Sequence, residues 1–188
     1  INVNQYLAHL GIEEHPPLSA AGLVKLQKAH LLRVPFENLS IYYGQPISLS
    51  LNQLYTKVVE QGRGGFCYEL NTLYQALLAR LGFEAQLIAG RVYSNQQETY
   101  GPDFDHMAVL VWLPNGGYIS DVGFGAFPLD PVPFTVEQLH HLPGGIYRIN
   151  RFDSAYYRLS KMSKGEVYPQ YLFDSQPRQV TDFAEMCH

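Results

Sequence analysis

The chain has 188 residues, which is enough for one or two ordinary domains that bury about 70% of the surface of the unfolded chain. Hydrophobic residues make up 46% of the sequence and charged residues only 16%, so the composition excludes a disordered chain. The formal net charge is −4 and the basic residues are scattered singly, which argues against a nucleic acid as partner.

The first 83 residues show the apolar spacing of amphipathic helices. Ser19 and Ser50 are suited to cap the second and third helices at their N-termini, and Pro35 stops the second. Glycines follow the first, third and fourth helices, as expected at helix C-termini. The predicted helices span residues 2–10, 20–34, 51–61 and 67–81.

From Glu84 onward the apolar period changes from helical to alternating, which indicates β-strands. Two turn sequences, at residues 114–117 and 163–165, separate strand-like runs and predict hairpin loops. We therefore expect an antiparallel sheet or a small barrel. Asp182, three residues before Glu185, predicts a capping box that opens a final helix. The predicted strands span residues 85–88, 91–93, 107–113 and 118–122.

The fold class that follows is α+β, with a helical domain at residues 1–83 and an antiparallel β-barrel-like domain at residues 84–178. Only two cysteines occur and there is no Cys-x-x-Cys motif, which predicts no metal site and a reducing compartment, the cytoplasm. Since no apolar run could span a membrane and no signal peptide opens the chain, we expect no membrane association. The sequence leaves the oligomeric state open.

The stretch RGGFCYELN, residues 63–71, places Cys67 behind two glycines at the start of a predicted helix. Backbone N–H groups and the positive end of the helix dipole favour a thiolate at such a position. The glycines allow a sharp turn and leave room for a substrate beside the sulfur. The alternative is that Cys67 is a core residue, because free cysteine is among the most buried residue types.

A nucleophilic cysteine needs a base within hydrogen-bond reach and a group that orients this base. His106 opens an apolar strand and is the candidate base, the alternative being a surface histidine at a strand end. Asp121 closes the next strand, and a hairpin at residues 114–117 would set its side chain beside His106. Asp103 and Asp105 are rivals for the acidic role, but they lie in a polar loop where we expect them to be solvated.

Four separate motifs stand in a fixed order along the chain. They are PFENL at residues 35–39, RGGFCYELN at residues 63–71, a histidine opening an apolar strand at His106, and DVGFG at residues 121–125. Together, in this order and spacing, they resemble the arylamine N-acetyltransferase family. Any one motif alone would be weak, whereas the combination is specific.

The resemblance covers nearly all of the chain and implies a cysteine-protease-like arrangement. In that arrangement a helical first domain, a β-barrel-like second domain and a third α/β lid are joined by an interdomain helix. The third domain of the family would follow His188. We therefore expect this sequence to hold the first two domains and, at residues 179–188, the start of the linking helix, with the third lid domain absent from it.

The resemblance also implies acetyl transfer by a ping-pong mechanism. The thiolate of Cys67, paired with an imidazolium at His106, would take an acetyl group from acetyl-CoA. The acetyl group would then pass to the nitrogen of an arylamine or arylhydrazine, or to the oxygen of an arylhydroxylamine. Asp121 would fix the tautomer of the imidazole, and the Cys67 amide would help to hold the oxyanion. The expected partners are acetyl-CoA and small aromatic amines or hydrazines.

Residues around these three match other positions of the family. Phe36, Val92 and Phe124 would line the acyl and acceptor pocket, with simple core packing as the alternative for the first two. Arg63 and Glu37 would form an ion pair that holds the loop of the nucleophile, in a structural role. Three residues match the glycine-containing loop beside the CoA pyrophosphate: Gly125, Ala126 and Phe127.

Two other functions stay open at this stage. A cysteine hydrolase would use the same three residues with water in place of the amine, because the residues alone do not name the acyl acceptor. A catalytically silent binding module would keep the fold without the chemistry. The complete motifs at residues 63–71 and 121–125 favour the transferase over both alternatives.

Overall fold

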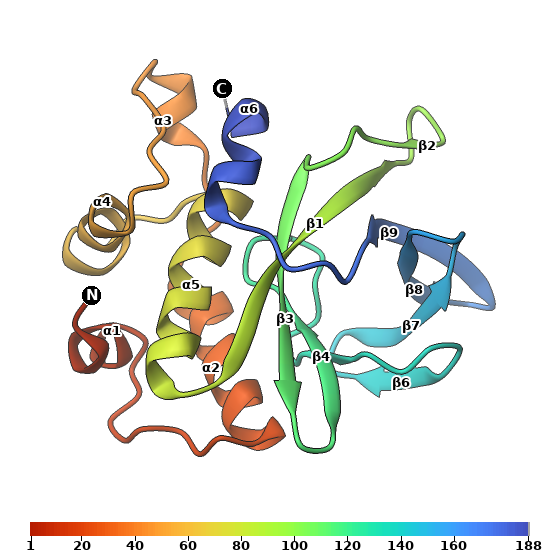
Figure 1. Ribbon diagram of the computed structural model, residues 1–188, viewed down its shortest axis with the longest axis horizontal. Coiled ribbons are helices and arrows are strands. Elements are labelled where there is room, and N and C mark those ends of the chain that lie inside the picture. Colours follow the sequence, from red (N-terminus) through yellow and green to blue (C-terminus); the bar gives the residue numbers. More distant parts are fainter. Residues whose placement is uncertain (188) are drawn as a thin grey trace.

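The computed structural model describes residues 1–187 and shows helices packed against an antiparallel sheet that is almost closed into a barrel (Figure 1). The helices are α1 Val3–His9, α2 Ala20–Arg33, α3 Leu39–Tyr42, α4 Leu51–Tyr55, the π-helix η1 Thr56–Glu60 and α5 Cys67–Leu81. The strands are β1 Glu84–Ser94, β2 Thr99–Tyr100, β3 His106–Leu113, β4 Gly116–Ser120, β5 Val132–Pro133, β6 Leu139–Leu142, β7 Gly145–Arg151, β8 Tyr157–Ser163 and β9 Glu166–Phe173. A 3₁₀ helix, η2 Val180–Phe183, and α6 Ala184–Cys187 follow. His188, the last residue of the predicted segment 179–188, lies outside the described residues.

The ends of the helices follow the predicted chemistry in part. Ser19 caps α2, because its Oγ accepts a hydrogen bond of 3.3 Å from the N–H of Gly22. Gly82 ends α5 in the left-handed conformation, with φ of 99°. Ser50 occupies the predicted N-cap position of α4, but its side chain forms no capping hydrogen bond. Its own N–H instead donates to the Oγ of Ser48 at 3.1 Å.

Two helical segments differ from their predicted form. The predicted helix at residues 51–61 widens into the π-helix η1, in which the N–H of Gln61 bonds the carbonyl of Thr56 five residues earlier. The predicted capping box at the C-terminal end begins earlier than expected. Asp182 accepts a hydrogen bond of 2.8 Å from the N–H of Gln179. It is therefore the last residue of a capping box that starts at Gln179 and opens η2, and not the first residue of a box that ends at Glu185.

The sheet has the strand order β5-β4-β3-β1-β9-β8-β7-β6, with β2 paired to the far end of β1. The two predicted strands at residues 85–88 and 91–93 are one continuous strand, β1. The predicted strand at residues 118–122 ends at Ser120, because Val122 turns toward α5 and donates its N–H to Asn71. A bridge between Val136 and Ile149 brings the segment after β5 to β7 and nearly closes the barrel.

The apolar core has two parts, and this arrangement positions the site. One part lies between the helices and the face of β1 and β3 that α5 covers, as Figure 1 shows for α5. The other part fills the barrel, from Ile88 and Leu110 to Tyr147 and Phe173. These observations confirm the predicted α+β fold, with helices first and an antiparallel barrel second. No helix within residues 1–187 is both long and apolar enough to cross a membrane.

Candidate active site

Cys67 is the first residue of α5, where the chain leaves a tight turn. A side chain on Gly64 would lie 1.8 Å from the carbonyl oxygen of Pro35, and one on Gly65 would lie 2.7 Å from the carboxylate of Glu69. The neighbour of Gly64 is backbone, so only glycine fits there, whereas a side chain at Gly65 would require the Glu69 side chain to shift. The Glu69 carboxylate in turn accepts from the N–H that precedes Cys67, at 3.2 Å, and ties the start of the helix to its first turn.

Two ion pairs lie under this turn. Arg63 Nη2 is 2.8 Å from Glu37 Oε1, and Lys57 Nζ, which η1 places toward α5, is 2.7 Å from the nearly buried Glu69. Burial alone would raise the pKa of Glu37, but hydrogen bonds from the Leu39 N–H and from Arg63, together with the charge of Lys57, lower it. The turn that carries Cys67 is therefore held on both sides by ion pairs.

His106 opens β3 and is buried beside Cys67. Its Nε2 lies 2.7 Å from Asp121 Oδ2, so the other ring nitrogen is the one free to face the sulfur. Burial lowers the pKa of His106, whereas the charge and hydrogen bond of Asp121 and the neighbouring Cys67 raise it, with a net rise to about 10. The imidazole is therefore held in its charged form at neutral pH.

Asp121 is completely buried and lies one residue beyond β4. It is not directly opposite His106, because the register pairs Val109 with Ser120, and its side chain reaches His106 diagonally across the hairpin. Four groups donate to its two oxygens: His106 Nε2 at 2.7 Å, Tyr171 Oη at 3.2 Å, Asn71 Nδ2 at 2.9 Å and the Gly123 N–H at 2.9 Å. A buried carboxylate with this many donors has its charge well compensated.

The rival acids take other partners. Asp105 is half-buried and accepts from the N–H of Val92 at 2.9 Å, and burial, offset in part by that bond, raises its pKa. Asp103 is exposed and accepts from the hydroxyl of Tyr156 at 2.8 Å. Neither carboxylate forms a hydrogen bond with His106 in the described part of the chain.

The segment after Asp121 lies directly on the start of α5. A side chain on Gly123 would come within 2.6 Å of Cys67 Cα and 2.7 Å of Asn71 Nδ2, so glycine is required for this approach. The ring of Phe124 then packs edge-on against His106, with centroids 5.3 Å apart. The sulfur, the imidazole and an aromatic wall are thereby brought into one place.

An apolar cavity of about 230 Å³ lies next to this place, between the end of α2 and the segment that follows β4. Of the predicted pocket and loop residues, it brings together Phe36, Phe124, Gly125 and Phe127, whereas Val92 and Ala126 do not line it. Val92 instead stands opposite Tyr171 in the pairing of β1 with β9. The full lining is Leu31, Val34, Phe36, Val122, Phe124, Gly125, Phe127 and Leu129.

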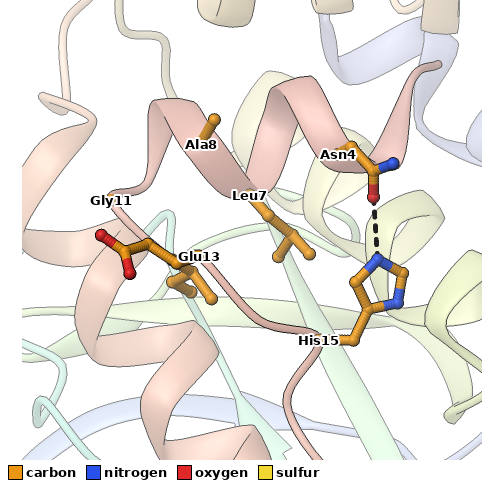
Figure 2. A pocket seen from close by; sticks show the side chains of 7 residues that line it. Asn4, Leu7, Ala8, Gly11, Glu13 and His15 are labelled. Carbon is orange, nitrogen blue, oxygen red and sulfur yellow. Dashed lines mark hydrogen bonds between the residues drawn. The ribbon is translucent and has the colours of Figure 1, made fainter.

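A second cavity, of about 310 Å³, lies beside α1 and is lined by residues that are far from Cys67 in the sequence (Figure 2). Its polar feature is a hydrogen bond of 2.8 Å between His15 Nε2 and Asn4 Oδ1, and its other lining residues include Leu7, Gly11 and Glu13. It contains no nucleophile. No group of three or more side chains suited to hold a metal occurs within residues 1–187.

Four buried polar residues of the site were missed at the level of sequence. Asn71 could have been found, because it lies four residues after Cys67 and hence on the same face of α5. Tyr171, Gln27 and Ser120 carry no such local signal. They reach the site from β9, α2 and β4, and only the fold brings them together.

Known proteins that are similar to this chain in sequence include arylamine N-acetyltransferases. A family model described as N-acetyltransferase matches residues 20–188. The arylamine N-acetyltransferase of Mycolicibacterium smegmatis is 34% identical, over 97% of this chain and 68% of the relative. The pineal gland isozyme NAT-3 of Gallus gallus is 32% identical, over 97% of this chain and 70% of the relative. The chain thus spans about 70% of the length of these relatives.

Solved structures agree as well. The M. smegmatis arylamine N-acetyltransferase superposes with a TM-score of 0.91 at 30% identity, over 100% of this chain and 70% of that one. A Bacillus cereus arylamine N-acetyltransferase, described as having a Cys-His-Glu catalytic triad, gives a TM-score of 0.87 at 32% identity, over 98% of this chain and 73% of that one. In the present chain, the acid that is hydrogen-bonded to His106 is an aspartate, Asp121.

Proposed function

Because this chain belongs to the arylamine N-acetyltransferase family, we propose that it transfers acetyl groups from acetyl-CoA to arylamines and arylhydrazines, and to the oxygen of arylhydroxylamines, through an acetyl-cysteine intermediate. The observation that carries the proposal is the buried pair of His106 and Asp121, 2.7 Å apart, beside a cysteine at a helix N-terminus. A nucleophile, a base and an orienting acid in this order form an acyl-transfer site.

In the first half-reaction the thiolate of Cys67 attacks the thioester carbonyl of acetyl-CoA. The carbon–sulfur bond to CoA breaks, and the imidazolium of His106 gives its proton to the departing CoA thiolate. Backbone N–H groups at the start of α5, that of Cys67 among them, stabilise the oxyanion of the tetrahedral intermediate. The product is an acetyl thioester on Cys67 and a neutral imidazole.

In the second half-reaction the acceptor nitrogen attacks the acetyl thioester. The neutral His106 takes the proton of the amine, the bond from carbon to the Cys67 sulfur breaks, and the thiolate–imidazolium pair is restored. Asp121 keeps the proton on Nε2 throughout, so that the nitrogen facing the sulfur is the one that exchanges protons.

The surroundings of the site support an aromatic acceptor. Phe36 and Phe124 line the apolar cavity beside the site, and flat apolar walls suit an aryl ring. We place the CoA pyrophosphate along Gly125, Ala126 and Phe127, and keep Val92 as a wall of the acyl site. The pair Arg63 and Glu37 holds the turn. Two widely spaced cysteines make no disulfide framework, which favours a reducing compartment, so we place the protein in the cytoplasm.

Intact-mass spectrometry after brief exposure to acetyl-CoA tests the proposal. We expect a single acetyl adduct on the wild-type chain, none after alkylation with iodoacetamide and none on Cys67→Ala. An arylamine should then discharge the adduct and appear as its amide. Discharge at the same rate without amine would indicate a cysteine hydrolase, and no adduct on a folded chain would indicate a silent binding module.

A further inference from the structure

Gln27 lies in the middle of α2 and has no exposed surface, yet it is a polar residue among apolar neighbours. Its side chain does not serve its own helix. Its Oε1 accepts from the Oγ of Ser120 at 2.8 Å and from the N–H of Asp121 at 3.2 Å, while its Nε2 donates to the carbonyl oxygen of Pro128 at 2.9 Å. All three partners lie about a hundred residues further along the chain.

These bonds fix the orientation of the amide. Two donors face its oxygen and one carbonyl faces its nitrogen, so a flipped amide would place donor against donor and acceptor against acceptor. Ser120 is itself fixed, because its Oγ also contacts the hydroxyl of Tyr74 on α5 at 3.1 Å. Without Gln27, the N–H of Asp121 and the carbonyl of Pro128 would be left as buried groups without these partners.

The two ends of the amide hold the two ends of one segment, residues 121–128. That segment carries the acid at Asp121, the close approach of Gly123 to Cys67 and the wall formed by Phe124. Between its ends, Val122 donates its N–H to Asn71, and the ring of Phe124 packs against His106 and Tyr171. Gln27, from another part of the fold, bonds backbone groups at both ends of this segment.

Resting on the proposed function, we propose that Gln27 is a positioning residue: its amide clamps both ends of residues 121–128 and so fixes Asp121 against His106 and the pocket wall against α2. Gln27 forms no hydrogen bond with Cys67 within residues 1–187. It acts through the backbone of Asp121 and Pro128, in the way that an outer layer of hydrogen bonds holds a catalytic group at its working geometry.

The test compares Gln27→Met with Gln75→Met. Methionine keeps the length of glutamine and removes the hydrogen bonds. Gln75 is a matched control, because it is also a helical glutamine whose Nε2 donates to a backbone carbonyl, that of Ala85, at 2.8 Å, away from the site. The measured quantities are the rate of Cys67 alkylation by iodoacetamide, the low-field proton resonance of the hydrogen bond from His106 to Asp121, and the midpoint of thermal unfolding.

We expect alkylation to be between about tenfold and a hundredfold slower in Gln27→Met, since small displacements of a catalytic group cost this much. The low-field resonance should shift in Gln27→Met, and both readouts should stay at wild-type values in Gln75→Met. If the two variants lose similar thermal stability and alkylate at the same rate, Gln27 is only structural and the proposal falls. Should Gln27→Met not fold, Gln27→Asn, one methylene too short to reach both ends, is measured with the same two outcomes.

Alkylation needs no acyl donor, so this test is separate from that of the proposed function. A wild-type chain that forms no acetyl adduct would overturn the acetyl transfer, while the comparison of the two glutamines would still decide the clamp.

Discussion

At the scale of single residues, the site depends on how the charge of Asp121 is held. Its oxygens are acceptors only, and every group around them is a donor, so the ionised form satisfies all of them. One consequence is that the proton of His106 is fixed on Nε2. Another consequence is that a side chain with an N–H donor in place of Asp121 would set that donor against one of the donors already present.

Asp121→Asn is therefore expected to reduce the rate of acetyl transfer by roughly 10³- to 10⁴-fold, because the amide cannot enforce the tautomer of His106. It should also lower the free energy of unfolding by about 1–3 kcal/mol, through one unsatisfied buried donor. Steady-state rates and urea unfolding measure the two effects. Asp103→Asn, in the exposed loop, is the control and should keep wild-type values; a rate within tenfold of wild type for Asp121→Asn would contradict the role of the acid.

The pH dependence of stability follows from His106. Its pKa is raised from an ordinary 6.5 to about 10, so the folded state holds a proton that the unfolded state releases. The contribution to stability is complete below pH 6.5 and is lost as the pH rises to 10. The difference in the free energy of unfolding between wild type and His106→Gln should therefore shrink across this range, by at most about 1.4 kcal/mol per pH unit. A difference that stays constant from pH 6 to 10 would refute the linkage.

The sequence predicts some residues of the site and not others for a physical reason. Cys67 and Asp121 stand in short motifs whose glycines are needed for close contacts, so local sequence carries the information. Gln27 lies in an ordinary amphipathic helix, where the sequence pattern predicts that an amide side chain is exposed to solvent. Gln27 is buried because the segment that ends at Pro128 packs on it, and the residues near Gln27 in the sequence do not predict this contact.

At the scale of elements, the site lies at the termini of one helix and two strands. Cys67 begins α5, His106 begins β3, and Asp121 follows the last residue of β4. Groups at the ends of regular elements are held by them yet leave space for a substrate. β4 is one of the elements whose predicted bounds were wrong: it stops at Ser120, so that residues 121–123 can turn onto α5.

Gly123→Ala tests this contact between elements. The added methyl group would lie 2.6 Å from Cys67 Cα, and the neighbour is backbone, which cannot give way cheaply. We expect a loss of about 1–3 kcal/mol in the free energy of unfolding and a loss of most acetyl transfer, as the segment moves off α5. Gly125→Ala is the control for stability, because nothing lies within 4 Å of its added methyl group. Equal stability of the two variants would mean that the contact is looser than described.

At the scale of the whole molecule, the helical part and the barrel share a core. Leu70 and Leu77 of α5 belong to the same apolar cluster as Leu87 of β1 and Val109 of β3. The sequence predicts two regions, a helical one and a β one, because the apolar residues recur with different periods in the two. Their common core is not readable, since it depends on which face of each strand α5 covers.

A shared core predicts cooperative unfolding. The single tryptophan, Trp112, lies on β3 and packs against Phe134, so its fluorescence reports on the barrel. Far-UV circular dichroism reports mainly on the helices, and alkylation of Cys67 under denaturant reports on the start of α5. Because neither part can lose its half of the cluster without exposing the other half, we expect the three probes to give one urea midpoint. Two separated midpoints would show that the helical part and the barrel are stable independently, and the site would then be assembled only when two folded units dock.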